Sequence, residues 1–240
     1  MPTTKKQVIL FIVEGINDDT ALALPLEKLL TTEDVKFEVT HGDITSEIGG
    51  KDIAAKVGDC VKKHCEEYKY KREDFAEIVL LVDMDGAYIR KTSIEQSSGN
   101  AKPYYASDKI LYTDPDLLSR IHIVKQSNLN RLINLPYVYR TIPFSVYFFS
   151  CNLDHVICDN ANLSQREKSR EAEAFRKKHY NNPAALLTFF HDSSIKTGLL
   201  YDESWNYIKQ GLNSLRRLSN FHIFLSPNAI RFPRDFSSII

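Results

Sequence analysis

Two groups of acidic residues in this 240-residue chain have types and spacing that could do chemistry. The first is Glu14 with Asp18 four positions later, and the second is Asp83 with Asp85 two positions later. Four carboxylates in one place repel each other unless a cation lies between them, and Mg²⁺ and Mn²⁺ prefer oxygen ligands. These residues therefore predict a divalent-metal site, provided that the fold brings the two groups together.

Strands and helices alternate along the first 150 residues in a way that would bring the two groups together. Each group directly follows an apolar run, as expected for strands buried on both faces of a sheet. The strands are predicted at residues 8–13, 35–40, 78–82 and 145–150, and the helices at 18–30 and 52–68. We therefore expect an α/β fold, with a mainly parallel sheet flanked by helices and a ligand site at the carboxyl ends of its strands.

Less regular segments complete the expected fold. The polar residues 91–108, rich in Ser, Gly and Lys, predict a mobile loop, and residues 121–124 predict a short strand. Pro25 is expected to break or kink the first helix. The last third of the chain is charged and helix-prone, with helices predicted at residues 164–180, 183–190 and 204–218.

The segments around both acidic groups resemble the Toprim superfamily, which includes topoisomerases, bacterial primases, recombination mediators and several nucleases. Members carry an apolar strand ending in Glu-Gly with an Asp shortly after it, matched here by Val13-Glu14-Gly15-Ile16-Asn17-Asp18. A later strand ends in Asp-x-Asp, matched by Leu81-Val82-Asp83-Met84-Asp85-Gly86. The Glu-x-x-x-Asp spacing is most similar to small phage-defence nucleases of the overcoming-lysogenization-defect type. The resemblance implies a Toprim-like catalytic domain over residues 1–155. The helix-prone composition of residues 156–240 predicts a helical C-terminal extension packed on that domain.

The same resemblance implies a nuclease that uses Mg²⁺ or Mn²⁺ to hydrolyse phosphodiester bonds of DNA or RNA. It implies catalytic roles for Glu14, Asp83 and Asp85, and metal ligation by these three residues together with Asp18 and Asp154. For Asp18 and Asp154, capping of a helix N-terminus is the alternative interpretation. Nucleases of this kind often act in phage defence beside a separate ATPase. The expected partners are therefore nucleic acid, an ATPase subunit and, in a homodimer, a second copy of the chain.

Basic and aromatic side chains could hold nucleic acid beside the metal ion. Arg90 and Lys91 lie just beyond the Asp-x-Asp motif, and solvated surface charges are the alternative interpretation for both. Toprim nuclease sites usually carry a lysine, for which Lys196 is a candidate among several. Tyr104 and Tyr105 in the polar loop could stack on nucleobases.

Two other functions fit the same residues. A Toprim module without catalytic activity could bind nucleic acid or a protein partner, as recombination mediators do. Residues 82–86 also resemble the first motif of haloacid-dehalogenase-type phosphatases, in which the first Asp attacks phosphorus, but Ala87 stands where that motif has threonine. A binding module has no need of clustered carboxylates, whose charges repel each other. The nuclease is therefore the favoured hypothesis.

Charge is balanced overall and segregated along the chain. The net charge is zero, which excludes a uniformly basic nucleic-acid binder. Residues 1–100 hold 13 Lys+Arg against 19 Asp+Glu, and residues 101–240 hold 18 against 12. Basic side chains of the second half could hold a phosphate backbone if they face the carboxylates, and the alternative is that the two halves simply pack together. These residues are Arg120, Lys125, Arg131, Arg140, Arg166, Arg176, Arg216 and Arg217.

The cysteines and apolar runs indicate the compartment. Cys60, Cys65, Cys151 and Cys158 lack Cys-x-x-Cys spacing, so zinc ligation is not expected and reduced thiols in a cytoplasmic protein are predicted. No apolar run reaches about 18 residues, and no signal peptide is recognisable at the N-terminus. We therefore expect no membrane span.

Overall fold

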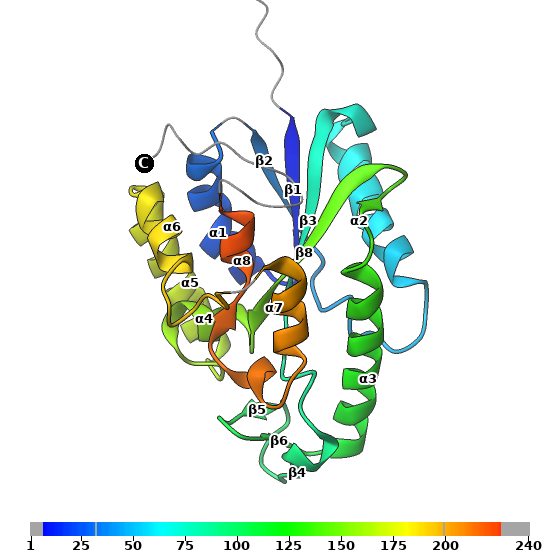
Figure 1. The fold of residues 1–240 in the computed structure, drawn as a ribbon, viewed down its shortest axis with the longest axis vertical. Coiled ribbons are helices and arrows are strands. Elements are labelled where there is room, and N and C mark those ends of the chain that lie inside the picture. The colour runs from blue at the N-terminus through cyan, green and yellow to red at the C-terminus, as the bar shows by residue number, and fades with distance from the viewer. Residues whose placement is uncertain (1–6, 32, 199, 227–240) are drawn as a thin grey trace, which may run out of the picture.

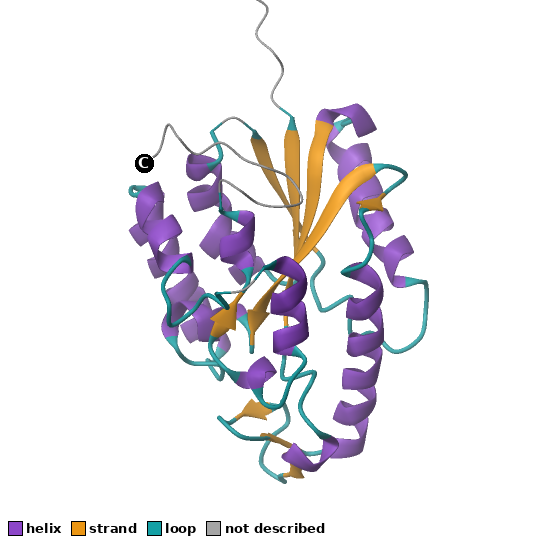
Figure 2. Ribbon diagram, viewed as in Figure 1, coloured by secondary structure: helices purple, strands orange, loops and turns teal. Residues whose placement is uncertain are grey.

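A mostly parallel sheet forms the centre of the computed structural model (Figures 1 and 2). The structure describes residues 7–31, 33–198 and 200–226. The parallel strands, in their order across the sheet, are β2 (Asp34–Val39), β1 (Val8–Val13), β3 (Phe75–Asp83) and β8 (Ile142–Ser150). Because these strands run in the same direction, their carboxyl ends share one edge of the sheet, where we expected the acidic residues to meet.

Helices cover both faces of this sheet, which explains why β1 is apolar along its whole length. All six residues of β1 are at most 1 % exposed. On one side lie α1 (Ile16–Leu29), α5 (Gln165–Tyr180) and α6 (Pro183–Phe190), and on the other lie α2 (Ile53–Tyr68) and α3 (Pro115–Leu132) (Figure 1). The α/β class and the sheet flanked by helices are therefore confirmed.

Segments from both before and after β8 in the sequence cover its outer edge. Two short strands pair antiparallel with β8, β7 (Tyr137–Val138) near its start and β9 (Leu218–Ser219) at its end. Between them, the hydroxyl of Tyr201 in α7 (Tyr201–Ile208) accepts from Val146 N and donates to Val146 O. A sheet edge with unpaired backbone groups invites aggregation, so this cover protects it. A short helix, α8 (Phe221–Phe224), adds aromatic rings to the core beside β1. The predicted boundary at residue 155 stays a prediction, and residues 227–240 of the predicted extension lie outside the described part.

A small second sheet follows the Asp-x-Asp motif, where a mobile loop was predicted over residues 91–108. It consists of β4 (Ile94–Gln96), β5 (Tyr104–Tyr105) and β6 (Ile110–Tyr112), next to a short 3₁₀ helix (Lys91–Ser93). An apolar cluster of its own supports it, and the buried members are Ile89, Ile94, Ile110, Leu118, Cys151 and Leu215. The prediction is wrong for residues 91–96 and 104–105, whose elements are too short to show a pattern in the sequence, whereas residues 97–103 and 106–108 form turns and irregular segments.

Two other local predictions are wrong, and for Pro25 the predicted break is absent whereas a kink at this residue stays a prediction. Residues 121–124 belong to α3, whose buried residues recur at helical spacing and whose start Asp114 caps by accepting from Leu117 N. Helix α1 continues through the buried Pro25 to Leu29. The helix predicted at residues 204–218 ends at Ile208 and is followed by a 3₁₀ turn (Asn213–Leu215).

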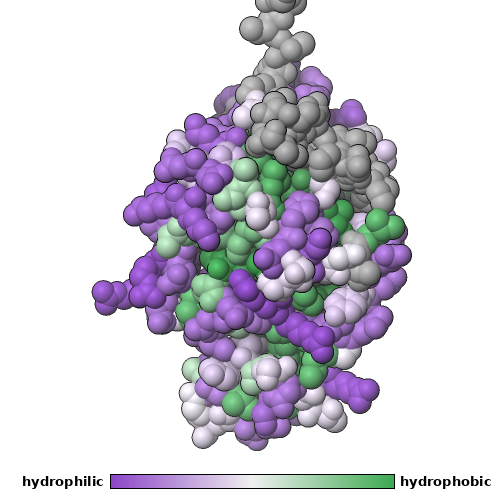
Figure 3. Space-filling view, turned by 60° about the vertical axis from the view of Figure 1, so that its left-hand side comes forward, coloured by the Kyte–Doolittle hydropathy of each residue, from purple (hydrophilic) through white to green (hydrophobic). Residues whose placement is uncertain are grey.

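Hydrophilic residues dominate the face shown in Figure 3, with smaller hydrophobic areas between them. Among the described residues, no helix combines the length and the apolar character needed to cross a membrane.

Candidate metal centre at the carboxyl edge of the sheet

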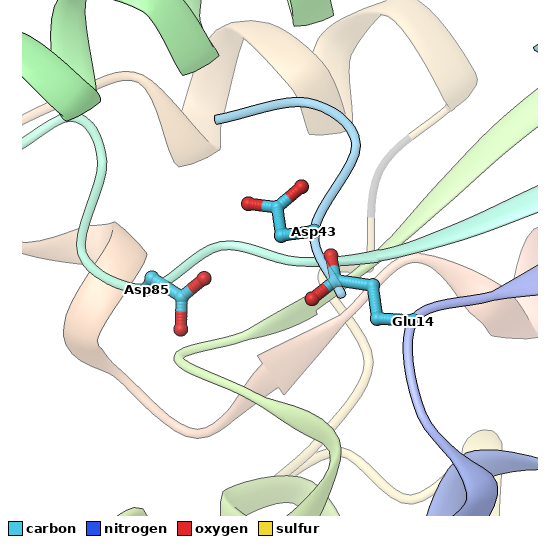
Figure 4. A group of neighbouring side chains, drawn as sticks. All are labelled: Glu14, Asp43 and Asp85. Carbon is cyan, nitrogen blue, oxygen red and sulfur yellow. The ribbon is translucent and has the colours of Figure 1, made fainter. Parts of the chain in front are cut away.

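Three carboxylates meet at the carboxyl edge of the parallel sheet. Glu14 follows β1, Asp43 lies in the loop after β2, and Asp85 follows β3. One oxygen from each lies within 4.8 Å of the others, and their side chains point toward a common space (Figure 4). The sequence predicted the meeting of Glu14 and Asp85, and Asp43 is an addition.

Backbone contacts hold the three residues in these positions. Asp83 N donates to Glu14 Oε1 at 3.3 Å, and Gly42 N donates to Glu14 O at 2.9 Å, which places the loop after β2 beside Glu14. Asp85 has a φ of 50° and donates its N–H to Cys151 O at 2.6 Å. The turn after β3 is therefore anchored to the end of β8, and it turns the Asp85 side chain back over the sheet edge.

Asp43 is held by its own loop. Its Oδ1 accepts from Thr45 N at 2.7 Å and from the Thr45 hydroxyl, and its Oδ2 accepts from Ser46 Oγ at 2.5 Å. Such turns, in which an Asp binds the backbone two residues later, fix the side chain before any ligand arrives. The carboxylate is thus preorganised and only 14 % exposed.

A buried lysine lies between two of the carboxylates. Lys125, on α3, is 1 % exposed, and its Nζ lies 2.7 Å from Asp43 Oδ2 and 2.6 Å from Asp85 Oδ2. Burial disfavours its charge, but the carboxylates of Asp43, Asp85 and Glu14 outweigh burial and raise the pKa of Lys125 well above its usual value. The ammonium is therefore charged, and it supplies the positive charge that the cluster requires.

Burial and neighbouring charges shift the pKa values of the acidic groups in the cluster. Burial first, and then Asp43, raise the pKa of Glu14 well above its usual value. Burial and the nearby Asp18 do the same for the pKa of Asp83. Asp43 differs, because Lys125 outweighs burial and lowers the pKa of its carboxyl group. One lysine thus does not neutralise the whole group, and a dication would favour the charged form of every carboxylate in it.

The remaining predicted ligands lie around a second lysine. Lys168 Nζ is 2.5 Å from Asp154 Oδ2, and both Asp83 and Asp18 also act on the pKa of Lys168. Asp18 accepts from Gly15 N at 2.9 Å, so it caps the start of α1, and burial raises its pKa to about 6. Asp154 does not cap its helix α4 (Leu153–Cys158), because Asn152 does so by accepting from His155 N.

Asp83 lies between the two groups. Its Oδ1 accepts from Leu153 N at the start of α4, at 2.9 Å, and the lysines that act on its pKa are Lys125 and Lys168. Within the described part of the chain, the set of oxygens that lie close enough for one ion does not include Asp18, Asp83 or Asp154. Their predicted role as metal ligands therefore stays a prediction.

The predicted phosphate ligands lie apart from the cluster. Lys91 forms an exposed ion pair with Asp116 at 2.7 Å, and Arg90 is exposed at the start of the same turn. Lys196 bridges to Ser219 through its backbone and acts on the pKa of Asp192 and His222. In the described ranges, no hydrogen bond or ion pair joins any of these three to the carboxylates. The lysine in the site is instead Lys125, one of the basic residues of the second half of the chain.

One aromatic residue of the small sheet also reaches the cluster. The Tyr105 hydroxyl donates to Asp85 Oδ1 at 3.0 Å, and burial followed by Asp85 raises the pKa of this phenol well above its usual value. Asp85 therefore has one oxygen bound by Lys125 and the other by Tyr105.

Comparison of the chain with protein-family models, curated proteins and solved structures yields no match.

Proposed function

We propose that this chain is a divalent-metal-dependent nuclease that hydrolyses phosphodiester bonds. The observation that carries the proposal is the convergence of Glu14, Asp43 and Asp85 within 4.8 Å at the carboxyl edge of a parallel sheet. This edge is where α/β proteins bind their ligands. The resemblance of residues 13–18 and 81–86 to the Toprim superfamily supports a nuclease as the specific activity.

The donor set fits Mg²⁺ or Mn²⁺, which Glu14, Asp43 and Asp85 would hold. All three are hard oxygen ligands, and metal–oxygen distances near 2.1 Å allow two ligand oxygens to lie up to roughly 4.2 Å apart, so small side-chain rotations suffice. A positive charge is already accommodated there, since Lys125 Nζ lies between Asp43 and Asp85. When bound, such an ion activates water and stabilises the leaving oxygen of a phosphodiester.

The residues of the chain around the ion have distinct roles in this proposal. Glu14 would hold the ion with one oxygen and could accept a proton from the attacking water with the other. Lys125 would balance the negative charge of Asp43 and Asp85 beside the ion. Tyr105 and the backbone N–H of Leu153 fix Asp85 and Asp83, so the site needs little rearrangement on binding.

Further parts of the hypothesis rest on the resemblance alone. Membership of the Toprim superfamily, action beside a separate ATPase and a role in phage defence are proposals of this kind. They follow from the two motifs and not from the geometry of the site.

A cleavage assay tests the proposal directly. Labelled single- and double-stranded DNA and RNA are incubated with Mg²⁺, Mn²⁺ or EDTA and with wild type, Glu14→Gln or Asp85→Asn. The matched control is Asp59→Asn, an exposed carboxylate of α2 that pairs with Lys51. We expect metal-dependent products with wild type and the control, and a loss of at least about 100-fold in rate for the two site variants.

Other outcomes of this assay, and of parallel assays of binding and of phosphomonoester hydrolysis, contradict the proposal. Nucleic acid that binds without metal and is cut under no condition would favour the non-catalytic binding module. Equal rates for all four proteins would locate the activity elsewhere, and release of phosphate from small phosphomonoesters without strand cleavage would favour the phosphatase.

A further inference from the structure

A cavity of about 510 Å³ opens directly beside the carboxylates, and the proposed function does not yet use it. Asp83 and Asp85 form its end nearest the candidate metal centre. Its walls come from the loop that leads into β5 and from the segment between α4 and α5, and they are Gly99–Tyr105, Asn152, Ala161–Gln165 and Lys168. Specific ligand pockets measure roughly 300–1,000 Å³, so this cavity has room for one ligand of nucleotide size and not for a duplex.

Part of the lining holds the walls together. Asn162 is paired with the backbone of Tyr105 in both directions, because its Oδ1 accepts from Tyr105 N and its Nδ2 donates to Tyr105 O, each at 2.8 Å. Asn152 caps α4 and donates to Ala161 O at 3.0 Å. The Asn162 contacts join the small sheet to the segment between α4 and α5, and the Asn152 contact ties the start of α4 to that segment. Both walls of the cavity are therefore held by hydrogen bonds.

Three other side chains of the lining make no such stabilising contacts with the described residues. No hydrogen bond or ion pair joins the side chain of Lys102, Tyr104 or Gln165 to any residue that the structure describes. All three residues are exposed. Tyr104 is 47 % exposed, so its ring face is open to a ligand in the cavity. A lysine, an aromatic ring and an amide are the groups that contact the phosphate, the face and the edge of a nucleotide.

The position of the cavity relative to the carboxylates limits what can bind. A base inside a duplex is stacked on both sides and paired at its edge, so it cannot enter a pocket unless it leaves the helix. We propose that the cavity takes one unpaired nucleotide next to the scissile phosphate, stacked on Tyr104 with its phosphate near Lys102. This inference rests on the proposed function and adds the substrate class, which is single-stranded segments of nucleic acid.

A binding experiment without metal separates this inference from catalysis. Fluorescence anisotropy in EDTA measures the Kd of wild type for a labelled single-stranded oligonucleotide and for the same strand in a duplex. We expect tighter binding of the single strand. We expect a Kd about 10-fold higher for Tyr104→Ala, from lost base stacking, and a shallower salt dependence for Lys102→Ala. The matched controls are Tyr137→Ala, a tyrosine of β7 that is 54 % exposed, and Lys51→Ala on the surface.

The results that overturn the inference differ from those that overturn the nuclease. Equal binding of single strand and duplex, or no change for Tyr104→Ala, contradicts the unpaired nucleotide even if wild type cleaves nucleic acid. Displacement of the oligonucleotide by free nucleoside monophosphates at equal molar concentration contradicts a strand and indicates a mononucleotide site. Selective single-strand binding that Tyr104→Ala weakens supports the inference even if no metal brings about cleavage, and that absence of cleavage counts against the proposed nuclease alone.

Discussion

The ammonium of Lys125 lies 2.6 Å from Asp85 Oδ2 inside the protein, and both residues are needed to explain the candidate metal centre. The lysine is 1 % exposed, whereas the aspartate side chain is 30 % exposed, so the pair extends from the core to the edge of the cavity. A buried charge is stable only while its partner remains. Lys125 therefore keeps the carboxylates together in the absence of an ion.

Replacing this lysine should make folding depend on a dication. Lys125→Met removes the only ammonium that contacts Asp43 and Asp85 in the described residues, and leaving buried charges unpaired costs about 3–5 kcal/mol. We expect a lower melting temperature in EDTA and a larger recovery with Mg²⁺ than wild type shows, because an ion replaces the missing charge. Differential scanning fluorimetry measures both. The control Lys51→Met, in an exposed pair, should change stability by less than about 1 kcal/mol. Equal effects of Mg²⁺ on both variants and wild type would argue against a metal site here.

Asp43 should matter for activity as much as the motif residues do. Asp43→Asn keeps an oxygen that can accept from Thr45 N but removes the charge that faces Glu14 and Lys125. We expect cleavage to fall by about 100-fold or more, with a weaker affinity for Mn²⁺ measured by titration calorimetry. Asp59→Asn is the control on the surface. Cleavage at the wild-type rate would show that Asp43 only shapes its loop.

The sequence predicted part of the site because part of it depends on strand ends alone. Glu14 and Asp85 follow apolar runs that had to be neighbouring buried strands, and β1 does pair with β3. Asp43 follows a strand as well, but three residues separate it from the end of β2 and no motif marks it. Lys125 lies on a helix 40 residues after Asp85, and an apolar segment beside it resembled a strand. Its role depends on how α3 packs, which one sequence does not reveal.

The errors in the fold prediction have the same cause, because packing between distant segments cannot be deduced from one sequence. Long buried strands and long amphipathic helices leave a periodic pattern, whereas β5 has two residues and β9 has two. Pairing between such short strands depends on residues far away, such as Asn162, which binds the backbone of Tyr105. Tertiary contacts therefore decided the structure of residues 91–108, and the polar composition indicated only that they are near water.

Replacing Gly86, which directly follows the Asp-x-Asp motif, should destabilise the protein. It adopts a φ of 68°, and a Cβ there would lie 2.7 Å from side-chain carbons of both Ile110 and Leu215. We expect Gly86→Ala to lower the free energy of unfolding by about 1–3 kcal/mol, measured by urea denaturation, because it combines backbone strain with overpacking. Gly58→Ala is the matched control, since a Cβ in that position of α2 meets nothing within 4 Å and should stabilise the helix by about 0.5–1 kcal/mol. Similar effects of the two changes would contradict the close packing of this turn.

His179 should make the protein less stable in acid. It is 1 % exposed on α5, its ring lies 4.3 Å from that of Phe175, and neither ring nitrogen has a hydrogen-bond partner in the described part. Burial lowers its pKa from 6.5 to about 4, so as the pH falls from 6.5 toward 4 the unfolded chain gains a proton that the folded chain does not. Stability is thus present above pH 6.5 and lost below it. We expect His179→Leu to stabilise the protein by about 1–2 kcal/mol more at pH 5 than at pH 7.5, measured by urea denaturation. An equal effect at both pH values would mean that packing, and not protonation of the unfolded chain, determines the contribution of His179.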